Sequence, residues 1–189
     1  VADQVKPEAK KVIQILNHLK LKTIMITGDN QRTAKAIAQQ IGLSDYISDV
    51  LPEGKVDAIK SLQASYGLVS MVGDGINDAP ALAIANVGFA IGTGTDVAIE
   101  SSDIILMRGS LHGLADAIAV SKATLKNIKQ NLFGAFIYNV AGVPIAAGIL
   151  YPFFGILLSP VVAGAAMAFS SLTVVTNANR LRFFKPQSH

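Results

Sequence analysis

Short apolar runs alternate with amphipathic stretches over about the first 110 residues. Apolar side chains recur at helical spacing in residues 7–20 and 32–41, and Gly42 is a typical residue for ending the second helix. Further helices are expected at residues 52–65, 77–84 and 96–101, and the apolar runs between the helices predict short strands at residues 23–26, 46–50, 68–72, 87–91 and 103–107. This alternation predicts an α/β domain with a parallel sheet covered on both faces.

The pattern changes after Leu111. A long helix is expected from that point, and no charged side chain occurs between Lys129 and Arg180. The sequence Tyr-Pro-Phe-Phe-Gly at 151–155 divides the uncharged tract into segments 132–151 and 156–176. Each segment has about twenty residues, or about 30 Å of helix, which is enough to cross the hydrocarbon core of a bilayer. The sequence predicts a transmembrane hairpin, with two buried helices of a soluble protein as the alternative.

The charges that flank this tract predict its orientation. Positive residues precede it and follow it, whereas the central loop has none: the flanking residues are Lys122, Lys126 and Lys129 on one side and Arg180, Arg182 and Lys185 on the other. By the positive-inside rule both ends face the cytoplasm. We therefore expect an integral membrane protein in contact with the lipid bilayer, with both termini cytoplasmic. The expected organisation is a domain over residues 1–121, then a stalk and two transmembrane helices over residues 122–189.

The overall composition agrees with a membrane protein. Hydrophobic residues make up 51% of the chain and charged residues only 15%, with a positive mean hydropathy. The net charge of +3 is too small to indicate a nucleic-acid partner, and no basic patch with interleaved aromatic residues occurs. The chain has no cysteine, which excludes disulfides and thiolate metal sites within it.

Candidate chemistry is concentrated in residues 71–80, Met-Val-Gly-Asp-Gly-Ile-Asn-Asp-Ala-Pro. Asp74 and Asp78 follow the predicted strand 68–72, at the sheet edge where open α/β folds bind ligands. Carboxylates of this kind suit Mg²⁺, which takes one or two of them together with waters and phosphate oxygens. Asn77 is a candidate helix cap. The alternative is an Asp/Gly/Asn turn with solvated acids.

Two further residues extend this candidate site. Thr27, at the end of its predicted strand, offers a hydroxyl and a backbone N–H to a phosphoryl oxygen, and Lys55 offers a compact positive charge. Asp74 would hold Mg²⁺, while Asn77 and Asp78 fix the loop or reach the ion through water. Such a set suits phosphoryl transfer, which depends on positioning and charge neutralisation. Taken singly, Thr27 is also compatible with a simple turn and Lys55 with a solvated helix start.

Three short strings resemble, in family order, the phosphorylation-domain motifs of P-type ATPases, within the haloacid-dehalogenase-like superfamily. They are Thr27-Gly28-Asp29-Asn30, Pro52-Glu53-Gly54-Lys55 and Gly73-Asp74-Gly75-Ile76-Asn77-Asp78. The resemblance implies a partial haloacid-dehalogenase-like (Rossmann-like) domain with ATP as substrate and Mg²⁺ as cofactor. It implies phosphate or nucleotide contacts at Thr27, Gly28, Asp29 and Lys55, Mg²⁺ at Asp74 and Asp78, and catalytic roles for Thr27, Lys55, Asp74, Asn77 and Asp78.

Two strings of that family do not occur in this chain. They are the phosphorylated Asp-Lys-Thr-Gly-Thr segment and the Thr-Gly-Glu dephosphorylation loop. The resemblance therefore implies the second half of a phosphorylation domain followed by the last two membrane helices, inactive by itself. Its expected partner is the remaining N-terminal part of the same pump, with the actuator domain, the nucleotide domain and the Cys-Pro-Cys helix.

The membrane segments resemble the signatures of Cu⁺-transporting members of the family. The strings that carry this resemblance are Tyr138-Asn139 and Met167-Ala168-Phe169-Ser170-Ser171. A Met thioether is a soft ligand suited to Cu⁺, and an Asn amide in hydrocarbon needs a partner. Asn139 and Met167 are equally far from Phe153, so an antiparallel hairpin places them at similar depth. Ordinary helix packing is the alternative for these residues.

The hypothesis is therefore the C-terminal portion of a Cu⁺-exporting P-type ATPase, an ATP hydrolase that translocates metal. The resemblance assigns the transported ion to Tyr138, Asn139, Met167, Ser170 and Ser171. Two alternatives remain, a membrane-anchored Mg²⁺-dependent phosphatase of the haloacid-dehalogenase type and a non-catalytic, truncated pump subunit.

Overall fold

The computed structural model describes residues 5–74, 76–92, 96–107, 109–155 and 159–186. Two compact units divide the chain, one up to Ala117 and one from Ile118 onward. Their boundary lies inside a long helix, close to the predicted boundary after residue 121. Each unit is described by itself below.

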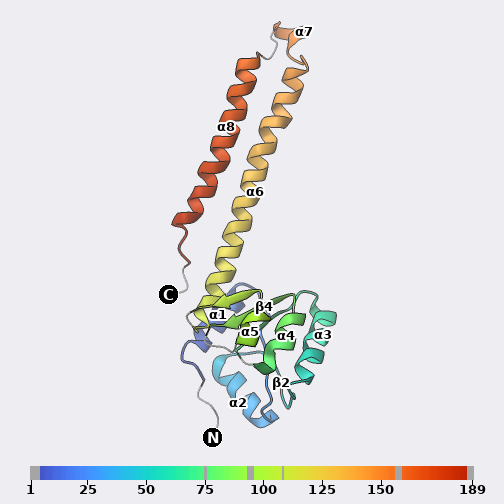
Figure 1. Ribbon diagram of the computed structural model, residues 1–189, viewed down its shortest axis with the longest axis vertical. Helices are drawn as coiled ribbons and strands as arrows, with labels where there is room; N and C mark the ends of the chain where they lie inside the picture. The colour runs from blue at the N-terminus through green and yellow to red at the C-terminus, as the bar shows by residue number, and fades with distance from the viewer. Residues whose placement is uncertain (1–4, 75, 93–95, 108, 156–158, 187–189) are drawn as a thin grey trace. The chain divides into compact units, whose positions relative to one another are not determined.

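The first unit alternates strands and helices along the chain (Figure 1). The strands are β1 (Ile24–Ile26), β2 (Asp45–Ile47), β3 (Ser70–Gly73), β4 (Val87–Ile91) and β5 (Ile104–Leu106). The helices are α1 (Ala9–His18), α2 (Gln31–Ile41), α3 (Gly54–Tyr66), the 3-10 turn η1 (Ile76–Asp78), α4 (Ala79–Ile84), α5 (Asp96–Glu100) and the start of α6 (His112–Ala146).

All strand pairs in the described residues are parallel, as predicted from the alternation. They form two sheets rather than the one expected: β1 pairs with β2, and β4 lies between β3 and β5. The alternation of elements predicts parallel strands but does not specify which strands are neighbours. As a result, β1 and β3, the strands that precede the two candidate site loops, are both edge strands of their sheets.

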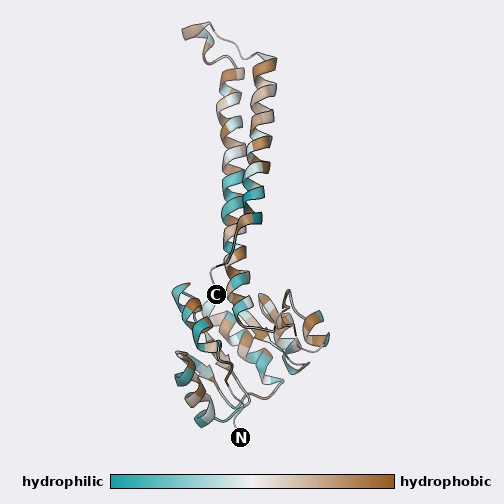
Figure 2. Ribbon diagram, turned by 90° about the vertical axis from the view of Figure 1, so that its left-hand side faces the viewer, coloured by the Kyte–Doolittle hydropathy of each residue, from teal (hydrophilic) through white to brown (hydrophobic). Residues whose placement is uncertain are grey.

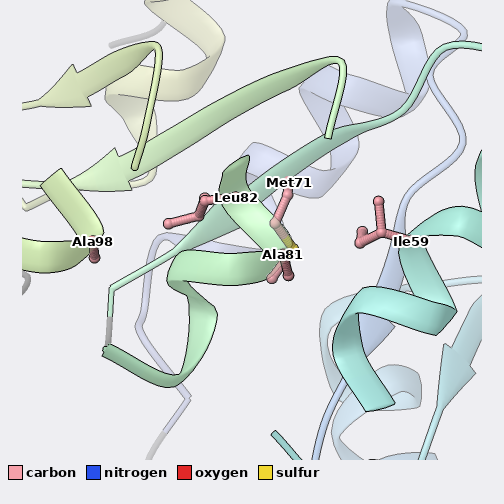
Figure 3. Close-up of a cluster of buried hydrophobic side chains, with 5 residues drawn as sticks. All are labelled: Ile59, Met71, Ala81, Leu82 and Ala98. Carbon is pink, nitrogen blue, oxygen red and sulfur yellow. The ribbon is translucent and has the colours of Figure 1, made fainter. Parts of the chain in front are cut away.

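A cluster of buried side chains holds α3, α4 and α5 against β3 (Figure 3). Its members are Ile59, Met71, Ala81, Leu82 and Ala98, and Ile26, Val69 and Ala85 pack against it. Leu82 is 1% exposed, so truncating it to Ala is expected to cost about 2–5 kcal/mol of stability. Small residues allow the close packing: a Cβ on Gly88 of β4 would lie 2.8 Å from the carbonyl oxygen of Leu82.

Both ends of α2 follow the expected capping chemistry, whereas the start of α4 does not. The side chain of Asn30 accepts a hydrogen bond from the Thr33 N–H at 3.0 Å and caps α2, and Gly42 ends the same helix in the left-handed conformation, as predicted. The predicted cap at Asn77 is wrong. Residues 76–78 form η1, and α4 begins after Asp78, because the Asp78 carboxylate is bound elsewhere.

A polar link joins the start of the two-stranded sheet to the end of α3. Lys22 Nζ lies 3.1 Å from an Asp45 carboxylate oxygen, donates to the Tyr66 hydroxyl at 2.5 Å, and lies 4.6 Å from the centre of the Tyr66 ring. These contacts raise the pKa of Lys22 above its ordinary value. The hydrogen bond to Tyr66 is the larger cause, and the hydrogen bond to Asp45 is the second. The Lys22 and Asp45 side chains are both exposed to solvent, so the contribution of this pair to stability is small.

The second unit is a helical hairpin in which α6 and α8 (Pro160–Asn179) run side by side (Figures 1 and 2). Between them lies α7 (Tyr151–Phe154), ended by Gly155 in the left-handed conformation, and η2 (Arg180–Phe183) follows α8. The break falls where Tyr-Pro-Phe-Phe-Gly predicts it. In the described residues only one helix, spanning Pro160–Phe183, meets the length and composition for a membrane span.

Figure 2 colours the hairpin by hydropathy. Apolar residues predominate towards α7, and polar turns gather in the part of the hairpin farther from α7. No residue of α8 is buried, and the large apolar side chains of both helices are mostly exposed. Among its described residues, the second unit by itself therefore leaves much of the apolar surface of the hairpin exposed.

Candidate functional site

An ion pair links the start of α3 to the loop after β3. Lys55 Nζ donates to Asp78 Oδ1 at 2.5 Å, across 23 residues of sequence. Asp78 is only 8% exposed, and its other carboxylate oxygen, Oδ2, accepts a hydrogen bond from the Asp74 N–H at 3.3 Å. The Asp78 carboxylate is therefore hydrogen-bonded both to Lys55 and to the backbone of the loop after β3.

Gly73 makes this arrangement possible because it has no side chain. A Cβ at this position would lie 2.7 Å from Asp78 Cβ and 3.0 Å from Asp78 Cγ and Oδ2. Real Cβ atoms do not approach other atoms this closely, so the Asp78 side chain occupies space that only glycine leaves free. Gly73 lies at the end of β3, and its residue type fixes where the Asp78 carboxylate can sit.

The loop after β1 carries the second group of candidate residues. The Thr27 N–H donates to the Ile47 carbonyl at 3.0 Å, as a continuation of the strand pairing, so its hydroxyl is the group left for a ligand. That hydroxyl donates to an Asp29 carboxylate oxygen at 2.9 Å and accepts from the Asp29 N–H at 3.1 Å. Thr27 is half-buried, whereas Gly28 and Asp29 are exposed.

Val50 connects this loop to the start of α3. Its N–H donates to the Thr27 carbonyl at 3.1 Å, its carbonyl oxygen lies 3.4 Å from an ideal Gly28 Cβ, and its Cγ1 lies 3.3 Å from an ideal Gly54 Cβ. Val50 is thus hydrogen-bonded to Thr27 and lies close to Gly54, the residue before Lys55. Val50 carries no chemical signal in the sequence, since its role depends on its position between two glycines.

Of the two carboxylates that the sequence predicts to hold Mg²⁺, Asp74 is the more accessible and Asp78 is engaged within the protein. Asp74 is exposed, whereas both Asp78 oxygens already accept hydrogen bonds, and Asn77 is exposed. The described residues contain no group of three His, Cys, Asp or Glu side chains able to hold a metal ion. A single carboxylate is compatible with Mg²⁺, because this ion keeps several waters and takes phosphate oxygens as ligands.

The candidate residues for the transported ion lie on the two helices of the hairpin. Asn139 donates its amide to the Ala135 carbonyl at 3.1 Å on α6, and Ser171 donates to the Met167 carbonyl at 3.2 Å on α8, which places Met167 and Ser171 one turn apart. Met167 is 72% exposed, Tyr138 is exposed and Ser170 is half-buried. No hydrogen bond joins Asn139 to α8 among the described residues.

Comparison with known proteins places this geometry in a family. Residues 1–86 match the family model described as a haloacid dehalogenase-like hydrolase. The chain is 60% identical over 187 residues to the probable copper-transporting ATPase PacS of Synechococcus elongatus, and 59% identical over 186 residues to copper-transporting ATPase 2 of Rhizobium meliloti. The alignments cover 99% and 98% of this chain. Nearly the whole chain is thus similar to one part of the copper-transporting P-type ATPases.

The shared part of these P-type ATPases is limited. The chain spans 25% and 22% of the two relatives, about a quarter of a pump. The crystal structure of a zinc-transporting PIB-type ATPase in an E2·Pi state matches 95% of this chain and 28% of that protein, with a TM-score of 0.81 and 37% identity. The predicted resemblance to heavy-metal P-type ATPases is thus confirmed over nearly the whole chain.

Proposed function

We propose that this chain supplies the Mg²⁺- and phosphate-binding half of the phosphorylation domain of a Cu⁺-exporting P-type ATPase, together with part of the membrane path of the metal. The Lys55–Asp78 contact is the observation that carries the proposal. It brings two family motifs 23 residues apart to one point beside the carboxyl end of β3, where ligands bind in α/β folds. The names of the two curated relatives support copper as the transported metal.

Each residue of the site has a defined task in this proposal. Lys55 and the Thr27 hydroxyl bind the phosphoryl oxygens, and Asp78 orients Lys55 through their hydrogen bond. Asp74 holds Mg²⁺, which neutralises charge on the phosphoryl group when it is bound. Without phosphate the Thr27 hydroxyl donates its proton to the Asp29 carboxylate, and binding of a phosphoryl oxygen requires the hydroxyl to turn from that carboxylate to the phosphoryl oxygen while it still accepts from the Asp29 N–H.

The two sheets provide a place for the phosphorylated aspartate, which lies in a segment that these 189 residues do not contain. Thr27 follows β1 and Asp74 follows β3, and within the described part of the chain both strands are paired on one side only. We propose that a strand from the remaining part of the pump pairs with β1 and β3 and joins the two sheets into one. Its carboxyl end then lies between Thr27 and Asp74, which is where the acceptor carboxylate is required. By itself, the chain is inactive.

The membrane half of the proposal places α8 and the apolar part of α6 across the bilayer, with both ends at the cytoplasmic face. The length and composition of α8 support one span. Two observations support a pair of membrane spans formed by α6 and α8. They are the exposed apolar surface of both helices and the absence of charge between Lys129 and Arg180. Tyr138, Asn139, Met167, Ser170 and Ser171 then contribute to the Cu⁺ site, with the Met167 thioether as the soft ligand.

Phosphorylation of the complete pump by labelled ATP tests the catalytic half. Asp74→Asn keeps the shape of the side chain and removes its charge, so we expect the rate of phosphoenzyme formation to fall by about 10²-fold at fixed Mg²⁺. Asp57→Asn, which alters an exposed carboxylate of α3, is the matched control and is expected to behave as the parent. The 189-residue chain alone should form no phosphoenzyme. Parent-like phosphorylation of Asp74→Asn would contradict the assignment of Mg²⁺ to this carboxylate.

A further inference from the structure

Three asparagines join α6 to α8 at the polar part of the hairpin. Asn127 Nδ2 donates to the Asn177 carbonyl at 2.7 Å, Asn177 Nδ2 donates to Asn131 Oδ1 at 2.8 Å, and Asn131 Nδ2 donates to Asn127 Oδ1 at 3.1 Å. Arg180 donates to Asn177 Oδ1 at 2.9 Å. We call Asn127, Asn131 and Asn177 the asparagine clasp.

The clasp is a closed and largely buried set of hydrogen bonds. Asn127 is 6% exposed, and Asn131 and Asn177 are half-buried. The spacing of Asn127 and Asn131 puts both on one face of α6, one turn apart. Among the described residues, the two bonds between the clasp members of α6 and Asn177 are the only hydrogen bonds between α6 and α8. The clasp therefore specifies how the two helices align.

Hydrogen bonds between amide side chains specify the position of α8 along α6, because each bond requires one particular pair of residues to lie opposite each other. No side chain of α8 is fully buried, and the half-buried apolar residues of its packed face, Ala163, Ala166 and Val174, are small or β-branched and carry no directional bond that specifies the register. A shift of α8 by one residue moves it by about 1.5 Å along its axis and breaks the bonds to Asn177. The freed amide groups would then lack partners at a site that excludes most water.

The register set by the clasp determines the relative depth of two candidate copper ligands. Asn139 lies eight residues beyond Asn131 on α6, or about 12 Å along the helix. Met167 lies ten residues before Asn177 on α8, or about 15 Å along that helix. Because the helices are antiparallel, both residues lie on the α7 side of the clasp, at depths that differ by about 3 Å (Figure 1). A slip of one helical turn would change this difference in depth by about 5.4 Å.

We propose that Asn127, Asn131 and Asn177 are positioning residues, which hold α6 and α8 in the register that brings Asn139 and Met167 to similar depths, about 3 Å apart, for the transported ion. They act through the helices and do not themselves contact the metal. The inference rests on the proposed function in one respect, the identity of the transported ion. The alignment of α6 with α8 by the clasp does not depend on which ion is transported.

The register can be measured directly in this cysteine-free chain. Spin labels on cysteines introduced at Val143 of α6 and Val161 of α8, both exposed, report the distance between the helices in lipid bilayers. We expect one narrow distance in the parent. Asn177→Leu should shift it by about 1.5 Å or more, or broaden it. Asn179→Leu changes an exposed asparagine two residues away and should leave the distance unchanged.

Copper kinetics of the complete pump then test the positioning role. Asn177→Leu should raise the KM for Cu⁺ in ATP hydrolysis by about tenfold or more, whereas phosphorylation by inorganic phosphate stays at the parental level. Asn179→Leu should match the parent in both assays. Asn127→Leu, which removes the bond from the other helix, serves as a second variant should Asn177→Leu fail to insert, and the same shifts are expected.

The outcomes separate this inference from the proposed function. An unchanged distance in both clasp variants overturns the inference. A changed distance with a parental KM for Cu⁺ also overturns it, provided that Met167→Leu does impair transport. If Met167→Leu transports Cu⁺ as the parent does, the copper site of the proposed function fails, and the distance measurement still decides whether the clasp sets the register.

Discussion

Replacing Gly73 with alanine tests whether the Asp78 carboxylate is held where the structure places it. The added Cβ would lie 2.7 Å from Asp78 Cβ, whereas non-bonded carbons prefer about 3.5–4 Å. Asp78 is anchored by its hydrogen bonds to Lys55 and to the Asp74 N–H, so it has to move by roughly 1 Å with its partners. The substitution therefore stretches the contact on which the site depends.

The loss of stability expected for Gly73→Ala follows from the close packing around Gly73. Inserting a methyl group into a filled site destabilises by about 1–3 kcal/mol. For a domain of this size, that corresponds to a melting temperature lower by roughly 5–15 °C. Phosphoenzyme formation in the complete pump should fall as well, because Lys55 and the Asp74 loop are both displaced.

Gly54→Ala is the matched control for this test. A Cβ at Gly54 would meet only the end of the Val50 side chain, at 3.3 Å, and alanine favours the first turn of α3 by up to about 1 kcal/mol. Its stability should therefore stay within about 1 kcal/mol of the parent. Thermal unfolding followed by circular dichroism, with phosphorylation by labelled ATP, measures both variants. A Gly73→Ala protein that melts and phosphorylates like the parent would refute the reasoning.

Two further predictions concern the hairpin. Met167→Leu keeps the side-chain volume and removes the sulfur, so the stability of the protein should change by less than about 1.5 kcal/mol. Cu⁺-stimulated turnover of the pump should fall sharply, whereas phosphorylation by inorganic phosphate should survive. If the variant transports Cu⁺ as the parent does, Met167 is a packing residue. Cysteines at Ser110 and Lys185 should react with impermeant reagents only from the cytoplasmic side, and one at Phe153 only from outside. Labelling of the two ends from opposite sides would rule out the hairpin topology.

Local patterns predicted the elements of the first unit well. The strand expected at residues 87–91 is β4 with the same bounds, because its apolar run is bordered by a polar residue and a glycine. The end of α2 at Gly42 was also predictable, since only glycine adopts the left-handed conformation there at little cost. Asn30 was an available signal for the start of α2, as an asparagine directly before a helical pattern.

The sequence was less informative where distant residues decide the structure. Asn77 has the chemistry of a cap, yet α4 begins after Asp78, because Asp78 is held by Lys55 from another helix. The division into two sheets depends on which strands are neighbours, and no local pattern contains that information. The parts of the site that depend on residue type, Lys55 and the Asp74 loop, were predictable, whereas the connecting role of Val50 was not.

The hairpin illustrates the same limit. A count of apolar residues predicts two long helices and the break between them, but it assigns no role to single asparagines. The spacing of Asn127 and Asn131 indicates a common face, and this was a usable signal. Their partner Asn177 lies 46 residues beyond Asn131, and only the paired helices bring it to that face.

The ion pair between Lys55 and Asp78 also constrains how this sequence can diverge. Loss of Lys55 leaves a short and largely buried carboxylate beneath Gly73 that keeps the hydrogen bond from the Asp74 N–H but loses its ion pair, and this intermediate is costly. Loss of Asp78 leaves a lysine on the first turn of α3, whose long aliphatic stem can carry its ammonium group to the surface. Mutational paths that preserve folding therefore change the aspartate before the lysine, and a descendant that has lost catalysis is expected to retain the cation longer than its partner.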